Sequence, residues 1–223
     1  MNNIVLCIAP HPDDETLGCG GTLLKHKEDG DEIYWCIVTN IDENNGWPKE
    51  RVKSRQNEID EVSKMYGFKK TFKLNFPTTK LDTIPISTIV NSMSTVFNEI
   101  KPNIIYLPNK NDVHTDHGIV FKTAYSCTKN FRYPYVKKIL VYETLSETEF
   151  SPSLPENIFI PNVYNDITDF FEKKIEIMKV FDSEIMESFY PRSLSTIEAH
   201  SKYRGSRIGK KYAEVFNLIY LES

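Results

Sequence analysis

Short apolar runs alternate along this chain with longer segments in which apolar residues recur every three or four positions. Residues 4–9, Ile-Val-Leu-Cys-Ile-Ala, are apolar throughout, as expected of a strand covered on both faces. The alternation predicts an α/β fold with a mostly parallel sheet and helices on both of its faces. We predict strands at 4–9, 33–39, 71–76, 103–107 and 138–143, and helices at 17–29, 50–66, 84–100 and 118–127.

The last third of the sequence is less regular. Asp169 and Glu172 have the spacing of a capping box at the start of a helix. No repeat or shift in composition marks a boundary, so we expect one domain over residues 1–223. In this third we predict a loop at 151–161 leading into a short strand, a helix at 169–181, mixed structure at 182–202 and a helix-to-strand segment at 212–221.

Composition and charge exclude several classes of function. The 223 residues carry a formal charge of −4, which provides no broad basic surface to hold nucleic acid by its phosphates. No apolar run is long enough to cross a bilayer, and the N-terminal residues lack the features of a signal peptide. We therefore expect a cytoplasmic protein. The four cysteines include no Cys-x-x-Cys pair, which argues against a cysteine zinc site.

A polar cluster, His11-Pro12-Asp13-Asp14-Glu15, directly follows the first predicted strand. A histidine and an aspartate three residues apart can converge on one cation, and Pro12 stiffens the turn between them. Asp13 must then project differently from Asp14, which leaves it free for proton transfer. The alternative is that Asp14 only caps the helix that follows.

A second cluster, His114-Thr115-Asp116-His117, follows the predicted strand at 103–107. Because the loops after parallel strands open onto one edge of the sheet, both clusters should face the same crevice. Three of the five histidines of the chain fall in these two loops. Two histidines and one carboxylate with an open fourth position form a common catalytic zinc shell. Together the clusters favour a metal centre over two sets of helix caps.

The glycines after the first cluster raise another hypothesis, a nucleotide-binding oxidoreductase. Gly18, Gly20 and Gly21 follow the first strand, but Leu23 stands where Gly-x-Gly-x-x-Gly would be completed. The second predicted strand also ends without the acidic residue that binds a ribose. We set this hypothesis aside.

Two motifs resemble those of the PIG-L/LmbE family of zinc-dependent de-N-acetylases: Ala-Pro-His-Pro-Asp-Asp-Glu-Thr-Leu-Gly-Cys-Gly-Gly at 9–21 and His-Thr-Asp-His at 114–117. Weaker similarity extends over most of the chain. The resemblance implies a Rossmann-like sheet, in agreement with the pattern above. It also implies removal of an N-acetyl group from a small N-acetylated amino sugar or its conjugate.

The resemblance further implies a ligand set. His11, Asp14 and His117 match the three metal ligands, for one zinc ion per chain, although other divalent metals such as iron and cobalt accept similar ligands. Bound zinc lowers the pKa of a water molecule to about 7 and so provides hydroxide near neutral pH.

Asp13 matches the family's general base and can take a proton as water attacks. His114 matches the histidine that stabilises the oxyanion or protonates the leaving amine, with Asp116 behind it. Asp116 is expected to orient that imidazole and raise its pKa. Either His114 or Asp13 can give the amine its proton.

Arg55 is the first candidate for substrate binding because a guanidinium can grip phosphate or sugar hydroxyls. The alternative is a helix-surface ion pair with Glu58 at i,i+3. Asp112 and Glu143, at the carboxyl ends of predicted strands, are further candidates for the pocket. Trp47 is a candidate lid or stacking platform for a sugar.

Ser183-Glu184 departs from the family pattern, since many relatives have Ser-Gln there, and this concerns the substrate side or the packing. Three other functions stay open. They are hydrolysis of another C–N bond such as an amidine, a phosphoesterase that uses two metals, and a non-catalytic binding protein. The presence of Asp13 and His114 argues against the last.

Overall fold

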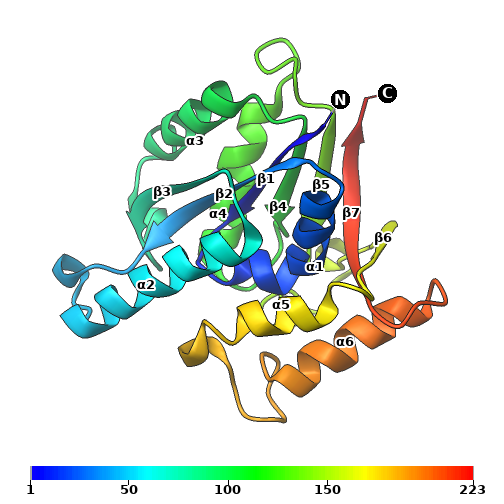
Figure 1. The fold of residues 1–223 in the computed structure, drawn as a ribbon. Helices are drawn as coiled ribbons and strands as arrows, with labels where there is room; N and C mark the ends of the chain where they lie inside the picture. The colour runs from blue at the N-terminus through cyan, green and yellow to red at the C-terminus, as the bar shows by residue number, and fades with distance from the viewer. Residues whose placement is uncertain (1, 223) are drawn as a thin grey trace.

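The computed structural model describes residues 2–222. Its strands are β1 (Ile4–Ala9), β2 (Glu32–Asn40), β3 (Lys70–Pro77), β4 (Ile104–Pro108), β5 (Lys138–Tyr142), β6 (Val163–Asp166) and β7 (Ala213–Leu221). They form one seven-stranded sheet in the order β3-β2-β1-β4-β5-β7-β6 (Figure 1). The first five strands pair in parallel, and β7 runs antiparallel to both β5 and β6. The predicted α/β fold with a mostly parallel sheet is confirmed.

Helices cover both faces of the sheet (Figure 1). One face packs against α1 (Asp14–Glu28), α2 (Lys49–Tyr66), α5 (Phe171–Met178) and α6 (Leu194–Ser206), and the other against α3 (Ile86–Ile100) and α4 (Thr115–Tyr125). Short 3₁₀ turns are η1 (Glu43–Asn45), η2 (Leu81–Thr83), η3 (Ser126–Thr128), η4 (Pro155–Asn157) and η5 (Asp182–Glu184). Within residues 2–222, no helix is both long enough and apolar enough to span a bilayer.

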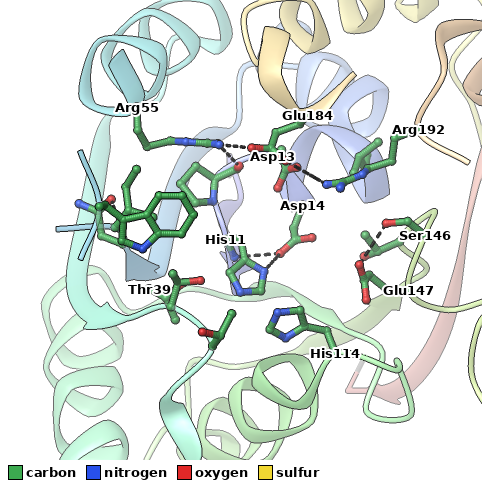
Figure 2. A pocket seen from close by; sticks show the side chains of 18 residues that line it. His11, Asp13, Asp14, Thr39, Arg55, His114, Ser146, Glu147, Glu184 and Arg192 are labelled. Carbon is green, nitrogen blue, oxygen red and sulfur yellow. Dashed lines mark hydrogen bonds and ion pairs between the residues drawn. The ribbon is translucent and has the colours of Figure 1, made fainter. Parts of the chain in front are cut away.

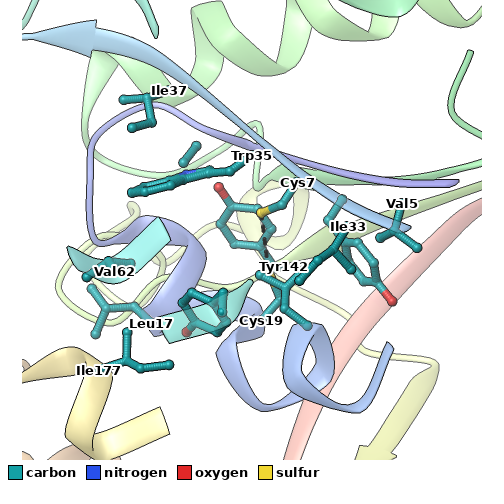
Figure 3. Close-up of a cluster of buried hydrophobic side chains, with 14 of the residues drawn as sticks. Val5, Cys7, Leu17, Cys19, Ile33, Trp35, Ile37, Val62, Tyr142 and Ile177 are labelled. Carbon is teal, nitrogen blue, oxygen red and sulfur yellow. Dashed lines mark hydrogen bonds between the residues drawn. The ribbon is translucent and has the colours of Figure 1, made fainter. Parts of the chain in front are cut away.

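Two hydrophobic cores lie on opposite faces of the sheet, and alternate residues of the central strands point into one or the other. In β1, Cys7 belongs to the core under α1, whereas Leu6 and Ile8 belong to the core under α3 and α4. Figure 3 shows the first core, in which Cys7 lies beside Trp35 and Tyr142. Burial of β1 on both faces fixes the position of the loop that follows it.

Two helices begin three residues before their predicted starts. α1 begins at Asp14 and α4 at Thr115, because their first turns are polar and an apolar pattern does not register them. His114 caps α4, since its Nδ1 accepts a hydrogen bond from the backbone N–H of Asp116 at 3.2 Å. Asp14 and His117 therefore lie in the first turns of helices, where the backbone is held by helical hydrogen bonds.

The region for which the sequence favours no single element contains a helix, α6. Its buried residues, Ile197, Ser201 and Gly205, recur every four positions, as on one helix face. Two of the three are small, so the helix has almost no apolar periodicity. This is why the sequence pattern does not reveal it.

The other elements of the last third partly match their predictions. The short strand after the 151–161 loop is confirmed as β6, and the helix at 169–181 is confirmed in its central part as α5. The capping box at Asp169 is wrong, because Phe170 is the N-cap of α5 and makes no side-chain hydrogen bond. The final segment is a strand, β7, without the helical part that we predict.

Helix α1 has a break in its middle, where side chains from the last third of the chain contact its backbone. Cys19 leaves helical geometry, with φ −144° and ψ 21°. Beyond the break, the Glu214 carboxylate of β7 accepts the N–H of Gly21 at 2.8 Å. Before it, the Lys174 ammonium of α5 donates to the carbonyl of Leu17 at 2.9 Å and to Glu214 at 2.7 Å. The buried ion pair between Lys174 and Glu214 therefore provides hydrogen-bond partners for backbone groups that have no helical partner at the break.

Close packing explains the glycines around this break. A Cβ at Gly18 would collide with the ring of Tyr142, and a Cβ at Gly21 would collide with Ile167. Gly18 and Gly21 therefore allow α1 to approach the sheet and the end of β6 closely, so their role is in packing.

Candidate metal centre and pocket

The two polar clusters meet at the edge of the sheet where the strand order changes direction. β1 pairs with β2 on one side and β4 on the other, and ligands bind outside such a point in open α/β sheets. His11 and Asp13 come from the loop after β1, and His114 comes from the loop after β4 (Figure 2). They line a cavity of about 240 Å³ together with Asp14, the first residue of α1.

His11, Asp14 and His117 converge as the sequence analysis expects. Their ligand atoms lie within 4.8 Å of one another. Oδ2 of Asp14 is 3.3 Å from Nδ1 of His11 and 3.4 Å from Nε2 of His117. Within residues 2–222, this buried Nε2 finds no hydrogen-bond partner. A buried imidazole nitrogen without a partner is costly, and one aimed at a carboxylate and a second imidazole fits a divalent metal ion.

A second group, His11, His114 and Asp116, also places its ligand atoms within 4.8 Å. The two groups share His11, whose Nε2 already lies 3.2 Å from Oδ2 of Asp116. The Asp116 carboxylate also accepts two backbone N–H groups, from Thr79 at 2.8 Å and Leu81 at 3.3 Å. Its oxygens are therefore satisfied by the protein, and the first group is the better metal site.

Asp112 lies behind His117. Its Oδ2 is 2.8 Å from Nδ1 of His117, and its Oδ1 accepts hydrogen bonds from Asn109 at 2.9 Å and from Thr148 at 2.7 Å. A carboxylate in this place fixes the ring so that Nε2 faces the site. Asp112 is buried behind the ligand and outside the cavity lining, so its prediction as a substrate-binding residue is wrong.

Asp116 lies behind His11, as Asp112 lies behind His117. Its carboxylate lies against His11, and only its backbone N–H contacts His114. Burial and the neighbouring His11 and His117 lower the pKa of His114 to about 4, against which the Asp116 charge is a smaller effect. The charge of Asp116 raises the pKa of His114 as predicted, but burial and the two histidines outweigh it. The carboxylate itself lies against His11, so it does not orient the ring of His114 directly.

Asp13 occupies strained backbone in the cavity wall. Its φ of 128° lies in a region that residues other than glycine rarely adopt, and its N–H donates to Oε2 of Glu15 at 3.1 Å. Its Oδ2 lies 3.3 Å from Nη1 of Arg192. Burial, and then the charges of Asp14 and Glu184, raise the pKa of Asp13 to about 8. The strain turns this carboxylate away from the ligand Asp14 and into the cavity.

Arg55 lines the cavity, but its guanidinium is already engaged. Nη1 donates to the carbonyl of Pro12 at 3.0 Å, Nε lies 3.2 Å from Glu58, and Nη2 pairs with Glu184. The ion pair with Glu58, considered as the alternative, is therefore present. Arg192, which lies 3.2 Å from Oε2 of Glu184, also lines the cavity.

No sequence pattern indicates Arg192, because it lies in an irregular segment with no motif around it. For Glu184, the exchange of glutamine for glutamate was the only signal. Glu147, after β5, also lines the cavity without a signal in the sequence. Trp47 lines the cavity as proposed and is 40% exposed.

Glu143 does not reach this cavity. Its carboxylate binds Arg204 at 2.6 and 2.9 Å and lies 3.2 Å from His200, beside a separate cavity. The prediction that it lines the same pocket is wrong. The other two histidines, His26 and His200, lie outside the cavity lining, and His26 is placed between Asp31 at 2.7 Å and the hydroxyl of Tyr106 at 2.9 Å.

A family model described as "PIG-L: GlcNAc-PI de-N-acetylase" matches residues 6–128, more than half of the chain and both polar clusters. The chain belongs to the PIG-L family. The family resemblance that we infer from the motifs is confirmed.

Two curated proteins show how far this PIG-L chain resembles its relatives. Diacetylchitobiose deacetylase of Thermococcus kodakarensis is 26% identical over 94% of this chain and 80% of its own length. The Bacillus cereus protein named "Probable N-acetyl-alpha-D-glucosaminyl L-malate deacetylase 2" is 22% identical over 82% of this chain and 84% of its own.

Solved structures share the fold at lower identity. The N,N'-diacetylchitobiose deacetylase of Pyrococcus horikoshii has a TM-score of 0.76 and 24% identity, covering 98% of this chain and 84% of that one. A 4-carboxy-2-hydroxymuconate hydratase of Pseudomonas putida has a TM-score of 0.75 and 14% identity, covering 100% and 98%. Because this fold also occurs in a hydratase, the reaction has to be argued from the site.

Proposed function

We propose that this PIG-L protein is a zinc-dependent de-N-acetylase that hydrolyses the acetamide of an N-acetylated amino sugar or its conjugate. The proposal rests on one observation above all. The buried Nε2 of His117 has no hydrogen-bond partner within residues 2–222 and faces the Asp14 carboxylate. Membership of a de-N-acetylase family and the names of the curated relatives support the choice of substrate.

His11, Asp14 and His117 would hold one zinc ion, with a fourth position open to the cavity. The ion would supply Lewis-acid polarisation of the amide carbonyl and a water molecule that is acidic near neutral pH. Asp112 and Asp116 would keep the two imidazoles oriented and increase their basicity from behind.

Asp13 acts as the general base in its ionised form, which a divalent ion held by the neighbouring Asp14 would favour over the protonated form that burial and the charge of Asp14 stabilise. It lines the cavity next to Asp14, so its carboxylate can take a proton from a water molecule that attacks the amide carbon. Its contact with Arg192 limits the directions in which the carboxylate can turn. After the attack, the protonated Asp13 returns the proton to the leaving amine.

His114 donates a hydrogen bond to the oxygen on which negative charge develops. Its Nδ1 accepts the N–H of Asp116, so the proton of the neutral imidazole resides on Nε2. A neutral donor fits the low pKa of this histidine. Of the two roles that the family resemblance implies for His114, a neutral imidazole fits stabilisation of the oxyanion, and the proton for the amine is then assigned to Asp13.

A panel of N-acetylated sugars tests the proposal by acetate release. We expect release that stops after chelation and returns with zinc, and one zinc per chain by elemental analysis. Release that persists in the chelated, metal-free protein would overturn the mechanism. Two metal ions per chain together with phosphate release from phosphoesters would favour the phosphoesterase alternative.

A further inference from the structure

Within residues 2–222, helices cover only part of the sheet face on which α3 and α4 lie. α4 packs over β4 and β1, whereas the helices that pack on β7, α1 and α6, lie on the opposite face. Figure 1 shows β7 and β6 on the side of the sheet away from α3. Next to α4, the partly covered face opens into a groove of about 610 Å³ between this helix and strands β5 and β7.

The floor of this groove is apolar. The rings of Phe121 and Tyr125, one helical turn apart on α4, stack with centroids 5.6 Å apart and planes 7° from parallel. Ile139 of β5 and Tyr220 of β7 line the groove beside them. The side chain of Tyr125 is 43% exposed. Burying apolar surface of this kind is favourable, and an exposed apolar groove with a polar rim is typical of an interaction site.

The rim of the groove is positively charged. Lys110, Lys122 and Lys129 line it and are exposed, and within residues 2–222 none of them forms an ion pair. The segment 101–142 contains only two acidic residues, and both are buried at the candidate metal centre. The groove therefore suits a segment that is apolar and acidic at the same time.

The loop 149–160 has these complementary properties. Its two acidic side chains, Glu149 and Glu156, are exposed and form no ion pair in the described part of the chain. No lysine or arginine occurs between residues 143 and 172. Four large apolar side chains of the loop are 49–62% exposed: Phe150, Leu154, Ile158 and Ile160.

The loop and the groove lie side by side on the molecule. Nδ2 of Asn111, the residue after Lys110, donates a hydrogen bond to the backbone carbonyl of Glu156 at 2.8 Å. Within the described chain, no residue of 149–160 lines the groove, so the loop does not fill the groove of its own copy. A two-fold axis beside such a pair lets each loop enter the groove of the other copy, so that one arrangement satisfies both surfaces.

We propose that this face is an interface between two copies of the chain, in which residues 149–160 of each copy enter the groove of the other. The glutamates of the loop then meet the lysines of the rim, and the apolar side chains of the loop cover Phe121 and Tyr125. The inference goes beyond the proposed function and does not depend on the reaction.

Two charge-reversed variants test the interface by light scattering after size exclusion, with the native protein expected to have the mass of a dimer. The groove variant carries Lys122→Glu and Lys129→Glu, and the loop variant carries Glu149→Lys and Glu156→Lys. Each variant places like charges opposite one another in its own dimer, so the dissociation constant should rise about 100-fold or more. As a control, Lys53→Glu with Lys64→Glu, the same charge change at exposed positions of α2, should remain dimeric.

An equimolar mixture of the groove variant and the loop variant provides the decisive measurement. In a mixed dimer, the glutamates of one groove meet the lysines of the other loop, and the lysines of the second groove meet the native glutamates. The mixture should therefore regain the mass of a dimer that neither variant has alone. Recovery requires both variants to be folded, so it excludes unfolding as the cause of dissociation.

The other outcomes overturn the inference. A monomeric native protein does so, whatever other partner then binds the groove, and so does a dimer that both variants leave intact. A mixture of folded variants that stays monomeric also overturns it. If melting curves show that a double variant is unfolded, the single changes Lys122→Glu and Glu156→Lys replace the two variants in the same experiment.

Discussion

The segment up to β5 and the segment after it both reach the cavity, but they hold their side chains in place differently. In the first, connections join parallel strands to helices, and the candidate ligands lie in the loop after β1 or in the first turns of α1 and α4, the helices that follow β1 and β4. In the second, Glu184 ends the short 3₁₀ turn η5 and Arg192 lies in a turn before α6. Glu184 is held by an ion pair to Arg55, and Arg192 by one to Asp13. The sheet thus positions the candidate metal ligands, and long-range charge pairs position Glu184 and Arg192 in the cavity wall.

This contrast suggests a division of labour. Side chains at the ends of buried strands move little, which suits groups that must hold a metal ion and transfer protons. A wall made of charge pairs can change its shape and charge through one substitution without disturbing the sheet. We therefore expect variants in the first segment to change the rate of the reaction, and variants in the wall to change the choice of substrate.

Asp13→Asn should have the largest effect. It removes the proposed general base but leaves His11, Asp14 and His117 untouched, so kcat should fall about 10²–10⁴-fold while the expected zinc content stays at one per chain. Asparagine also tolerates the positive φ at this position better than most residues. Acetate release and elemental analysis check the two expectations. Asp169→Asn, the same change at an exposed position, is the control, and native kcat in Asp13→Asn would refute the assignment.

Lys174→Met tests how strongly the second segment supports the first. Lys174 is 2% exposed, and its loss would leave Glu214 charged and unpaired beside the break in α1. Breaking a buried pair in this way should lower the free energy of unfolding by about 3–5 kcal/mol, measured in a denaturant titration. Metal affinity should weaken only where the protein unfolds, since His11 and Asp14 precede the break and His117 lies on a different helix, α4.

Lys173→Met is the matched control for that experiment. Lys173 is adjacent to Lys174, but its ion pair with Glu176 is exposed on both sides. The unfolding midpoint should therefore change little. Equal destabilisation by the two variants would show that the buried pair has no special role in joining the segments.

The two segments also differ in how much of their structure the sequence predicts. The buried strands have continuous apolar runs, and the two polar clusters follow two of them, so both the sheet and the meeting of His11, Asp14 and His117 can be predicted. Asp112 could be recognised as a pocket residue by position only. Its actual direction, toward His117, depends on the turn between β4 and α4, which no periodic pattern encodes.

The second segment resists prediction for physical reasons. α6 packs through Ser201 and Gly205, which carry no apolar signal. Arg192 is defined by partners 8 and 179 residues away in the sequence, Glu184 and Asp13. Long-range charge pairs of this kind have no local pattern, and only the folded chain brings them together.

Asp112→Asn should have the smallest effect of the three single changes, and it tests how the metal centre depends on groups behind it. Asparagine can still accept the hydrogen bond from Nδ1 of His117 through its Oδ1, but the negative charge that makes the imidazole a stronger ligand is lost. Zinc affinity should weaken about 10–100-fold, measured by competition with a chelating dye. At saturating zinc, kcat should fall less than in Asp13→Asn.

Thr148→Val, which removes only a hydrogen bond to Asp112, should give a smaller loss of zinc affinity in the same direction. If Asp112→Asn binds zinc as tightly as the native protein while Thr148→Val does not, the ring of His117 is held by the surrounding packing and the carboxylate has no part in tuning the metal centre.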